Sequence, residues 1–130
     1  PDLPVGVVME RSLVVQAGAP LIAGYEAPFP DASFKAGVLR FPQIVPTSPE
    51  DPGADQMRRV EAALGSWDRA ALVLFSTEDP IFSVEVGRRF AAHIPGAGPL
   101  ETVENAGHFL QEDQGEVVGA RLAAFLHRTG

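Results

Sequence analysis

Apolar residues recur at helical spacing in three segments of the second half of this chain. Residues 54–67, 83–94 and 115–128 each alternate apolar and charged positions with a period of three to four. That spacing is typical of helices with one face against a core. The face predicted to be buried consists, in the first segment, of Met57, Val60, Ala63 and Leu64, and in the last, of Val117, Val118, Leu122, Phe125 and Leu126.

Two short apolar runs lie between these predicted helices. "AALVLFS", residues 70–76, is continuous, which suits a strand buried on both faces of a parallel sheet. "PLETVE", residues 99–104, is a second strand, with Leu100 and Val103 as its buried positions. The order helix–strand–helix–strand–helix predicts an α/β fold with parallel strands and crossover helices.

The first half of the chain has a different pattern. Most of the 12 prolines lie in residues 1–53, where they leave room only for short helices and turns. We expect short helical pieces over residues 5–15 and 33–41. Residues 45–55, "VPTSPEDPGAD", read as a turn-rich linker.

Composition narrows the functional classes. The 130 residues are 45% hydrophobic, which is typical of a globular protein, and the net charge of −7 without a basic stripe argues against a nucleic-acid partner. No apolar run reaches the roughly 18 residues that a membrane span needs, and no signal peptide is visible. The absence of cysteine fits a cytoplasmic location and excludes thiolate chemistry. "PGAG" at residues 95–98 is no nucleotide-binding motif, so we expect neither a cofactor nor a metal ion.

The candidate chemistry lies just after the two predicted strands. Asp79 follows the first and His108 the second, 29 residues later, which suits one crossover helix between them. Functional groups of open α/β sheets lie beyond the carboxyl ends of strands, and adjacent strands are about 4.8 Å apart. We therefore expect an acid–base pair in which the carboxylate accepts the Nδ1 proton and leaves Nε2 to act as a general base.

Other polar residues nearby have simpler explanations. We expect Glu112 and Asp113 to form a solvated first helical turn that complements the helix dipole. His93 and His127 lie near helix ends, and we do not expect either to be catalytic.

The stretches "FSTEDPIF" and "NAGHFLQED" resemble the last third of α/β-hydrolases, most closely the haloalkane dehalogenases. "GYEAPFPDASFKAGVLRFPQIVPTSPEDP" resembles their cap domain and its return into the core, and "WDRAALVLFS" resembles the entry into the seventh strand. The resemblance implies the C-terminal part of an α/β-hydrolase fold, namely its last two parallel strands with flanking helices, plus part of a helical cap. Residues 1–53 would be the partial cap and return linker, and residues 54–130 the part of the core.

The same resemblance implies hydrolysis of a carbon–halogen bond in two steps. A nucleophilic aspartate displaces halide, and a histidine then activates the water that cleaves the alkyl ester. On this pattern Asp79 matches the acid and His108 the base. The positions that would line the substrate pocket are Phe29, Pro30, Ile81 and Phe82. The partners implied are a small apolar haloalkane, water and halide.

One part of the family's machinery has no counterpart in this sequence. There is no G-x-S-x-G elbow and no Asp-Trp pair, and the single tryptophan, Trp67, reads as a packing residue. The nucleophile and the halide-binding side chains would precede residue 1. We therefore expect a piece of a longer enzyme that needs the upstream half of its fold.

Three alternatives stay open at this point, two of them enzymes and one not. An epoxide hydrolase uses the same combination of nucleophilic aspartate, histidine and acid, together with cap tyrosines that polarise the epoxide oxygen. Tyr25 is the only tyrosine in this sequence, which weakens this alternative. Another α/β-hydrolase, such as an esterase, would differ in the nucleophile. A non-catalytic fragment or interaction module is the other class.

Overall fold

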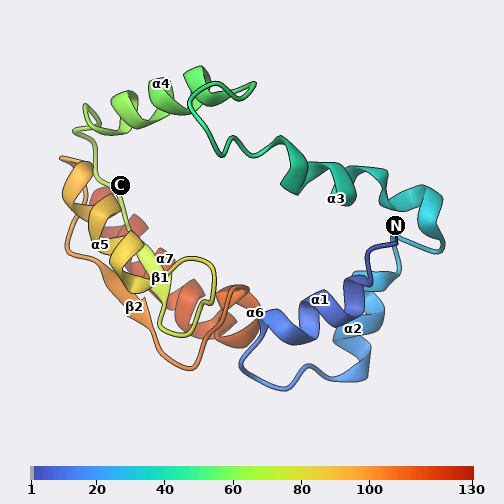
Figure 1. The fold of residues 1–130 in the computed structure, drawn as a ribbon. Helices are drawn as coiled ribbons and strands as arrows, with labels where there is room; N and C mark the ends of the chain where they lie inside the picture. Colours follow the sequence, from blue (N-terminus) through green and yellow to red (C-terminus); the bar gives the residue numbers. More distant parts are fainter. Residues whose placement is uncertain (1) are drawn as a thin grey trace. The chain divides into compact units, whose positions relative to one another are not determined.

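The computed structural model describes residues 2–130, and they divide into two compact units. The first contains the described residues up to Glu10 together with Ala17–Ala63, and the second contains Arg11–Gln16 together with Leu64–Gly130. The predicted division into cap and core at residue 53 remains a prediction. Figure 1 labels the elements of both units.

The first unit is made of short helices. In chain order they are α1 (Val5–Ser12, whose last residues belong to the second unit), α2 (Ala19–Glu26), η1 (Ala32–Lys35), α3 (Ala36–Arg40), η2 (Phe41–Ile44) and α4 (Ala54–Leu64). The helical piece predicted over residues 5–15 is present but ends at Ser12, and the piece predicted over residues 33–41 is present as α3 with a 3₁₀ turn on each side. The pattern did not predict α2, because its residues "APLIAGYE" are apolar nearly throughout and show no alternation of apolar and polar positions.

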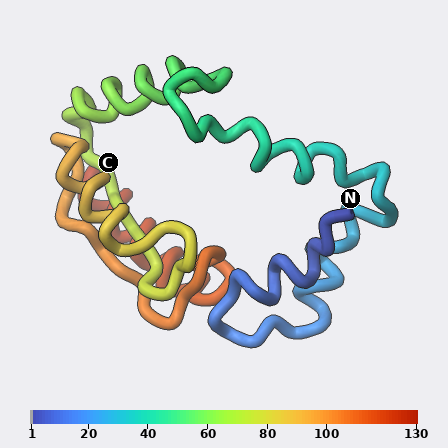
Figure 2. Tube along the Cα trace, in the orientation of Figure 1, coloured from blue at the N-terminus to red at the C-terminus, as the bar shows by residue number. Residues whose placement is uncertain are grey.

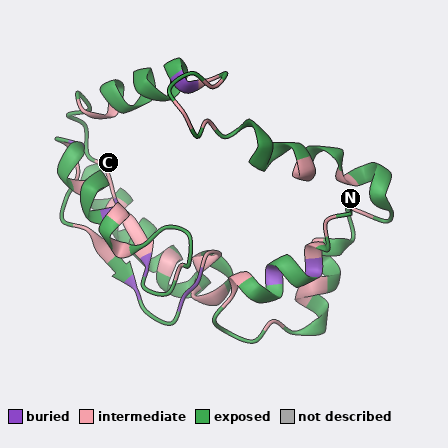
Figure 3. Ribbon diagram, viewed as in Figure 1, coloured by how far each residue is buried: buried purple, intermediate pink, exposed green. Residues whose placement is uncertain are grey.

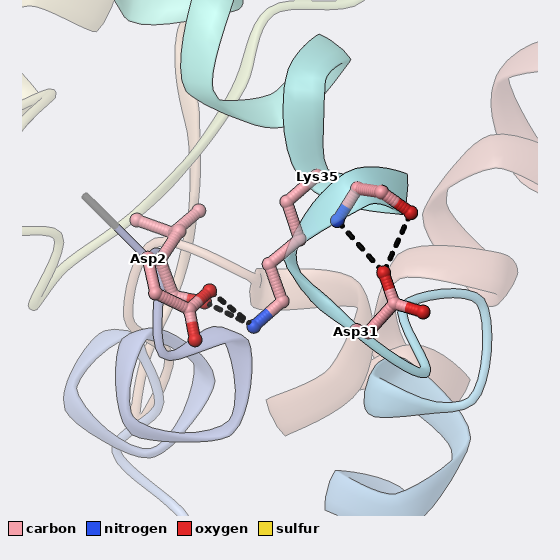
Figure 4. Close-up of polar contacts among 5 residues, drawn as sticks. Asp2, Asp31 and Lys35 are labelled. Carbon is pink, nitrogen blue, oxygen red and sulfur yellow. Dashed lines mark hydrogen bonds and ion pairs between the residues drawn. The ribbon is translucent and has the colours of Figure 1, made fainter.

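Polar contacts tie the start of the chain to η1 within this unit. Lys35 Nζ donates to Asp2 Oδ1 at 2.7 Å and to the carbonyl of Leu3 at 2.9 Å. Asp31 Oδ1 accepts from the backbone N–H of Ser33 at 2.8 Å and so caps η1. Figure 4 shows both groups of contacts.

The second unit is built on a two-stranded parallel sheet. β1 (Leu74–Ser76) pairs with β2 (Glu101–Val103) so that Leu74 lies opposite Glu101. Between them runs α5 (Val84–His93), and after them α6 (Leu110–Asp113) and α7 (Gly115–Thr129). Figure 2 traces this path from β1 through α5 to β2. The predicted parallel arrangement with one crossover helix is therefore confirmed.

The strands are shorter than the apolar runs predicted. Ala71 forms an isolated parallel bridge with Ala97, and regular pairing resumes only at Leu74. Next to this bridge, a Cβ on Gly96 would lie 1.9 Å from the carbonyl oxygen of Arg69. The chain crosses itself so closely at this point that only glycine fits.

Helices pack on this sheet through specific contacts. A Cβ on Gly87 of α5 would lie 2.8 Å from the ring of Phe75 and 2.9 Å from Leu100, so glycine allows α5 to approach β1 closely. Arg121 of α7 donates to Glu101 of β2 at 2.6 Å. In Figure 1, α5 is drawn in front of the strands and α7 behind them.

Few side chains are fully buried, as the small purple areas in Figure 3 show. The buried apolar residues are Met9, Ala54, Val73, Ile94, Val103 and Ala106. The predicted burial of Val103 is confirmed, whereas Leu100 is only half-buried.

The prediction of a buried face on α4 and α7 is wrong for most of the positions named, since only Leu64, Val118 and Phe125 are half-buried and none is buried. On α7 the exposed apolar side chains are Val117, Leu122 and Leu126, and on α4 they are Met57 and Val60. Leu126 is 65% exposed. The amphipathic pattern of α7 is real, but two three-residue strands offer too little surface to cover its apolar face. Among residues 2–130, no helix combines the length and the apolar character that crossing a bilayer requires.

Candidate active site

Asp79 lies in the loop that leaves the carboxyl end of β1. Pairing with the other strand continues past the regular ladder, because Thr77 N donates to Val103 O at 2.9 Å and Glu78 N donates to Ala106 O at 3.1 Å. Pro80 then prevents a helical conformation at Asp79. The loop therefore carries the carboxylate beyond the strand end, as predicted.

Both oxygens of Asp79 are engaged. Oδ1 accepts from the backbone N–H groups of Ile81, at 2.7 Å, and Phe82, at 3.0 Å. Oδ2 lies 3.0 Å from Nδ1 of His108. The side chain is only 7% exposed. The turn around Oδ1 thus aims Oδ2 at the imidazole.

The electrostatic balance keeps Asp79 ionised. Burial disfavours the charged carboxylate, but the two backbone N–H donors and then the imidazole outweigh it. They hold the pKa of Asp79 below its ordinary value of 3.8. An ionised carboxylate can accept the Nδ1 proton of His108 and stabilise a positive imidazolium.

The two ring nitrogens of His108 have different roles, because only Nδ1 contacts Asp79. Since Nδ1 faces a carboxylate, we assign the proton of the neutral ring to Nδ1, which leaves Nε2 as an acceptor. The side chain is 26% exposed. Phe82 and Phe109 lie beside the imidazole, with ring centroids 5.7 Å and 5.2 Å away. The arrangement can take a proton from water in an apolar setting.

The loop before His108 has an unusual backbone. Asn105 adopts φ 52°, a left-handed conformation that asparagine tolerates better than most residues. Ala106 is fully buried. A Cβ on Gly107 would lie 2.5 Å from the carbonyl oxygen of Ser12, and the N–H of His108 donates to that same oxygen at 2.8 Å. The small pair Ala106-Gly107 thus lets the loop pass directly against Ser12.

Asp113 has a different role from the one predicted. Its carboxylate accepts backbone N–H donors from Val14, Val15 and Gly107, whereas we expected a solvated helical turn. It is the last residue of the four-residue α6. The donors Val14 and Val15 lie almost 100 positions away in the sequence, and no local pattern indicates such a contact.

The predicted pocket residues fall in two groups. Ile81 and Phe82 are exposed beside the acid, and Phe82 contacts the imidazole ring. Phe29 and Pro30 line a hollow of about 480 Å³ inside the first unit, together with residues of α1 and α2. The structure therefore brings Asp79, His108 and Phe82 together in the second unit, whereas Phe29 and Pro30 belong to the first unit. Residues 2–130 contain no group of three or more potential metal ligands.

Known proteins resemble this chain along nearly its whole length. No family model matches it. A haloalkane dehalogenase of Mycolicibacterium paratuberculosis is 40% identical over 126 residues, covering 96% of this chain and 42% of that protein. A haloalkane dehalogenase of Psychrobacter cryohalolentis is 39% identical over 129 residues, covering 98% of this chain and 42% of that protein.

Solved structures give the same picture. A tetrameric haloalkane dehalogenase from Paraglaciecola agarilytica superposes with a TM-score of 0.82 at 28% identity, over 93% of this chain and 41% of that one. A putative ancestral haloalkane dehalogenase superposes with a TM-score of 0.86 at 27% identity, over 94% and 42%. The chain spans about two-fifths of the length of these relatives. The comparisons confirm the predicted resemblance to the C-terminal part of haloalkane dehalogenases and the predicted fold class.

Proposed function

We propose that this chain, which shares sequence and fold with the C-terminal part of haloalkane dehalogenases, supplies the acid and the base of such a hydrolase. The observation that carries the proposal is the 3.0 Å contact between Nδ1 of His108 and Oδ2 of Asp79 at the carboxyl ends of two parallel strands. Asp79 is the acid and His108 the base. The nucleophilic aspartate and the halide-binding groups lie in the remainder of the protein.

The reaction runs in two steps. First, an oxygen of the nucleophilic aspartate attacks the halogen-bearing carbon, so a C–O bond forms and the carbon–halogen bond breaks with release of halide. Second, Nε2 of His108 takes a proton from water while the water oxygen attacks the carbonyl carbon of the ester. The ester C–O bond then breaks, the leaving alcohol oxygen takes the proton from His108, and the carboxylic acid left on the enzyme loses its proton to water, which restores the carboxylate. Asp79 stabilises the imidazolium during this step.

The apolar surroundings suit a small haloalkane. Ile81 and Phe82 present apolar surface next to the acid–base pair, and Phe29 and Pro30 line the cavity of the first unit. Apolar walls bind a neutral haloalkane and leave the attacking carboxylate poorly hydrated, which favours displacement. We place this activity in the cytoplasm, since a chain without cysteine depends on no disulfide.

The test uses the complete protein in which this chain occurs. It is incubated with 1-bromobutane, and bromide and 1-butanol are measured. We expect equal molar amounts of both, and we expect no bromide from the 130-residue chain alone. Absence of bromide release by the complete protein, or release by the isolated chain, would contradict the proposal.

A further inference from the structure

We propose that Asp113 is a positioning residue for His108, because its carboxylate fastens the loop that carries the base to the distant segment Ser12–Val15. The inference rests on the proposed function, since it assigns Asp113 to the water-activating step. Asp113 acts through the backbone and touches no reacting atom.

Both carboxylate oxygens of Asp113 accept from the segment Val14–Val15, and Oδ2 also accepts from Gly107. Oδ1 accepts from Val15 N at 2.8 Å and Val14 N at 3.2 Å. Oδ2 accepts from Gly107 N at 2.8 Å and Val14 N at 3.1 Å. One side chain therefore connects the residue before the base to a segment almost 100 positions earlier. In Figure 2, the blue segment after α1 meets the orange-red loop around α6.

A direct backbone contact reinforces this connection. His108 N donates to Ser12 O at 2.8 Å, and Gly107 has no room for a side chain against that carbonyl. The two segments are thus as close as backbones can come. Displacing Gly107 would displace the next residue, which carries the imidazole.

The loop that carries Asp79 also contacts the loop that carries His108. Ala106 O accepts from Glu78 N, one residue before Asp79. Residues 106–108 are therefore held between the loop of the acid and the segment Ser12–Val15. Residues around an active site hold its reacting side chains in position. A displacement of a reacting side chain by about 1 Å can lower the rate roughly 100-fold.

Only a carboxylate of this length meets the requirement. Asparagine would put an NH₂ group where one oxygen now faces backbone N–H donors, whichever way the amide is turned. Glutamate adds a methylene and moves both oxygens. Asp113→Asn is therefore the sharpest variant, and Glu116→Gln, at an exposed acid of α7, removes the same charge without touching the contact.

The kinetic test separates the two steps in the complete protein. For Asp113→Asn we expect the halide burst within about twofold of wild type and ester hydrolysis slower by about 10- to 100-fold, since the burst needs no base. Glu116→Gln should leave both rates unchanged. Unchanged hydrolysis in Asp113→Asn, or an equal loss in both steps, would overturn the positioning role.

A spectroscopic test stands apart from dehalogenation. The Nδ1 proton of His108 should give a far-downfield resonance in wild type that is lost or shifted in Asp113→Asn and retained in Glu116→Gln. If the complete protein releases no halide, the proposed function fails, and this resonance still decides the positioning role. An identical resonance in wild type and Asp113→Asn would refute that role.

Two further measurements cover the case in which Asp113→Asn does not fold. Gly107→Ala should slow hydrolysis selectively, because its Cβ would push against Ser12 O. In the wild-type protein, the amides of Val15, Gly107 and His108 should be protected from hydrogen exchange. Free exchange at all three would overturn the proposal.

Discussion

Nδ1 of His108 lies 3.0 Å from Oδ2 of Asp79, although 29 residues separate them in the chain. The contact joins the loops that leave two adjacent parallel strands, and each loop also has contacts of its own. Oδ1 of Asp79 is fixed by the turn at Ile81 and Phe82, while the backbone of His108 is fixed by Ser12. The pair therefore depends on the fold at both ends.

Stability should depend on pH through Asp79. Its pKa is lower in the folded state than the ordinary 3.8, so folding favours the ionised carboxylate. The corresponding stability is fully present above about pH 3.8 and is lost as pH falls through the lower folded pKa. Urea unfolding of the complete protein should show Asp79→Asn less stable than wild type at pH 6, with a smaller difference at pH 3. A difference that grows towards pH 3 would contradict the assignment.

Asn105 should tolerate glycine better than alanine. Its φ of 52° is a left-handed conformation that costs most L-residues about 1–2 kcal/mol and costs glycine nothing. Asn105→Ala should therefore lower the free energy of unfolding of the complete protein more than Asn105→Gly, as measured by chemical denaturation. Equal effects of the two would mean that the backbone relaxes.

Two glycines in helices should respond oppositely to alanine. A Cβ at Gly87 meets Phe75 and Leu100 at under 3 Å, so Gly87→Ala should destabilise the complete protein by about 1–3 kcal/mol through overpacking. Gly119 of α7 has open space in this chain, and Gly119→Ala should be neutral or stabilising by up to about 1 kcal/mol. Thermal melting measures both variants, and a stabilising Gly87→Ala would show that α5 does not pack on β1 as described.

The 130-residue chain alone should associate. Apolar side chains on α7 and α4 are exposed, and in the first unit Val7, Val8 and Phe41 are exposed as well. Exposed apolar patches drive association. Size-exclusion chromatography should show species larger than a monomer, with binding of a hydrophobic dye. A monomer that binds no dye and melts cooperatively would mean that the chain needs no further part of the fold.

The pair of Asp79 and His108 could be predicted from the sequence, because each residue lies in a short local motif that follows a strand. Asp79-Pro80 ends one strand and Gly107-His108 follows another, and parallel strands bring their carboxyl ends together. The contacts of Asp113 could not be predicted, because its donors Val14 and Val15 are set by tertiary packing. The left-handed Asn105 likewise has no distinctive pattern in the sequence.

The prediction that the apolar face of α7 is buried failed for a physical reason. The spacing of apolar residues identifies the helix face correctly, but it does not supply the opposing surface that would bury that face. α2 was missed for the opposite reason, since an apolar segment with proline at its start shows no alternation.

The most direct test of the central claim is single-turnover kinetics of His108→Gln in the complete protein with 1-bromobutane, with His127→Gln as the control. Displacement needs no base and hydrolysis does, so His108→Gln should release one equivalent of bromide and then stop. Mass spectrometry should show an enzyme heavier by one butyl group, while His127→Gln should turn over like wild type. Steady turnover of His108→Gln at a rate near wild type, with no butylated enzyme, would show that His108 is not the base.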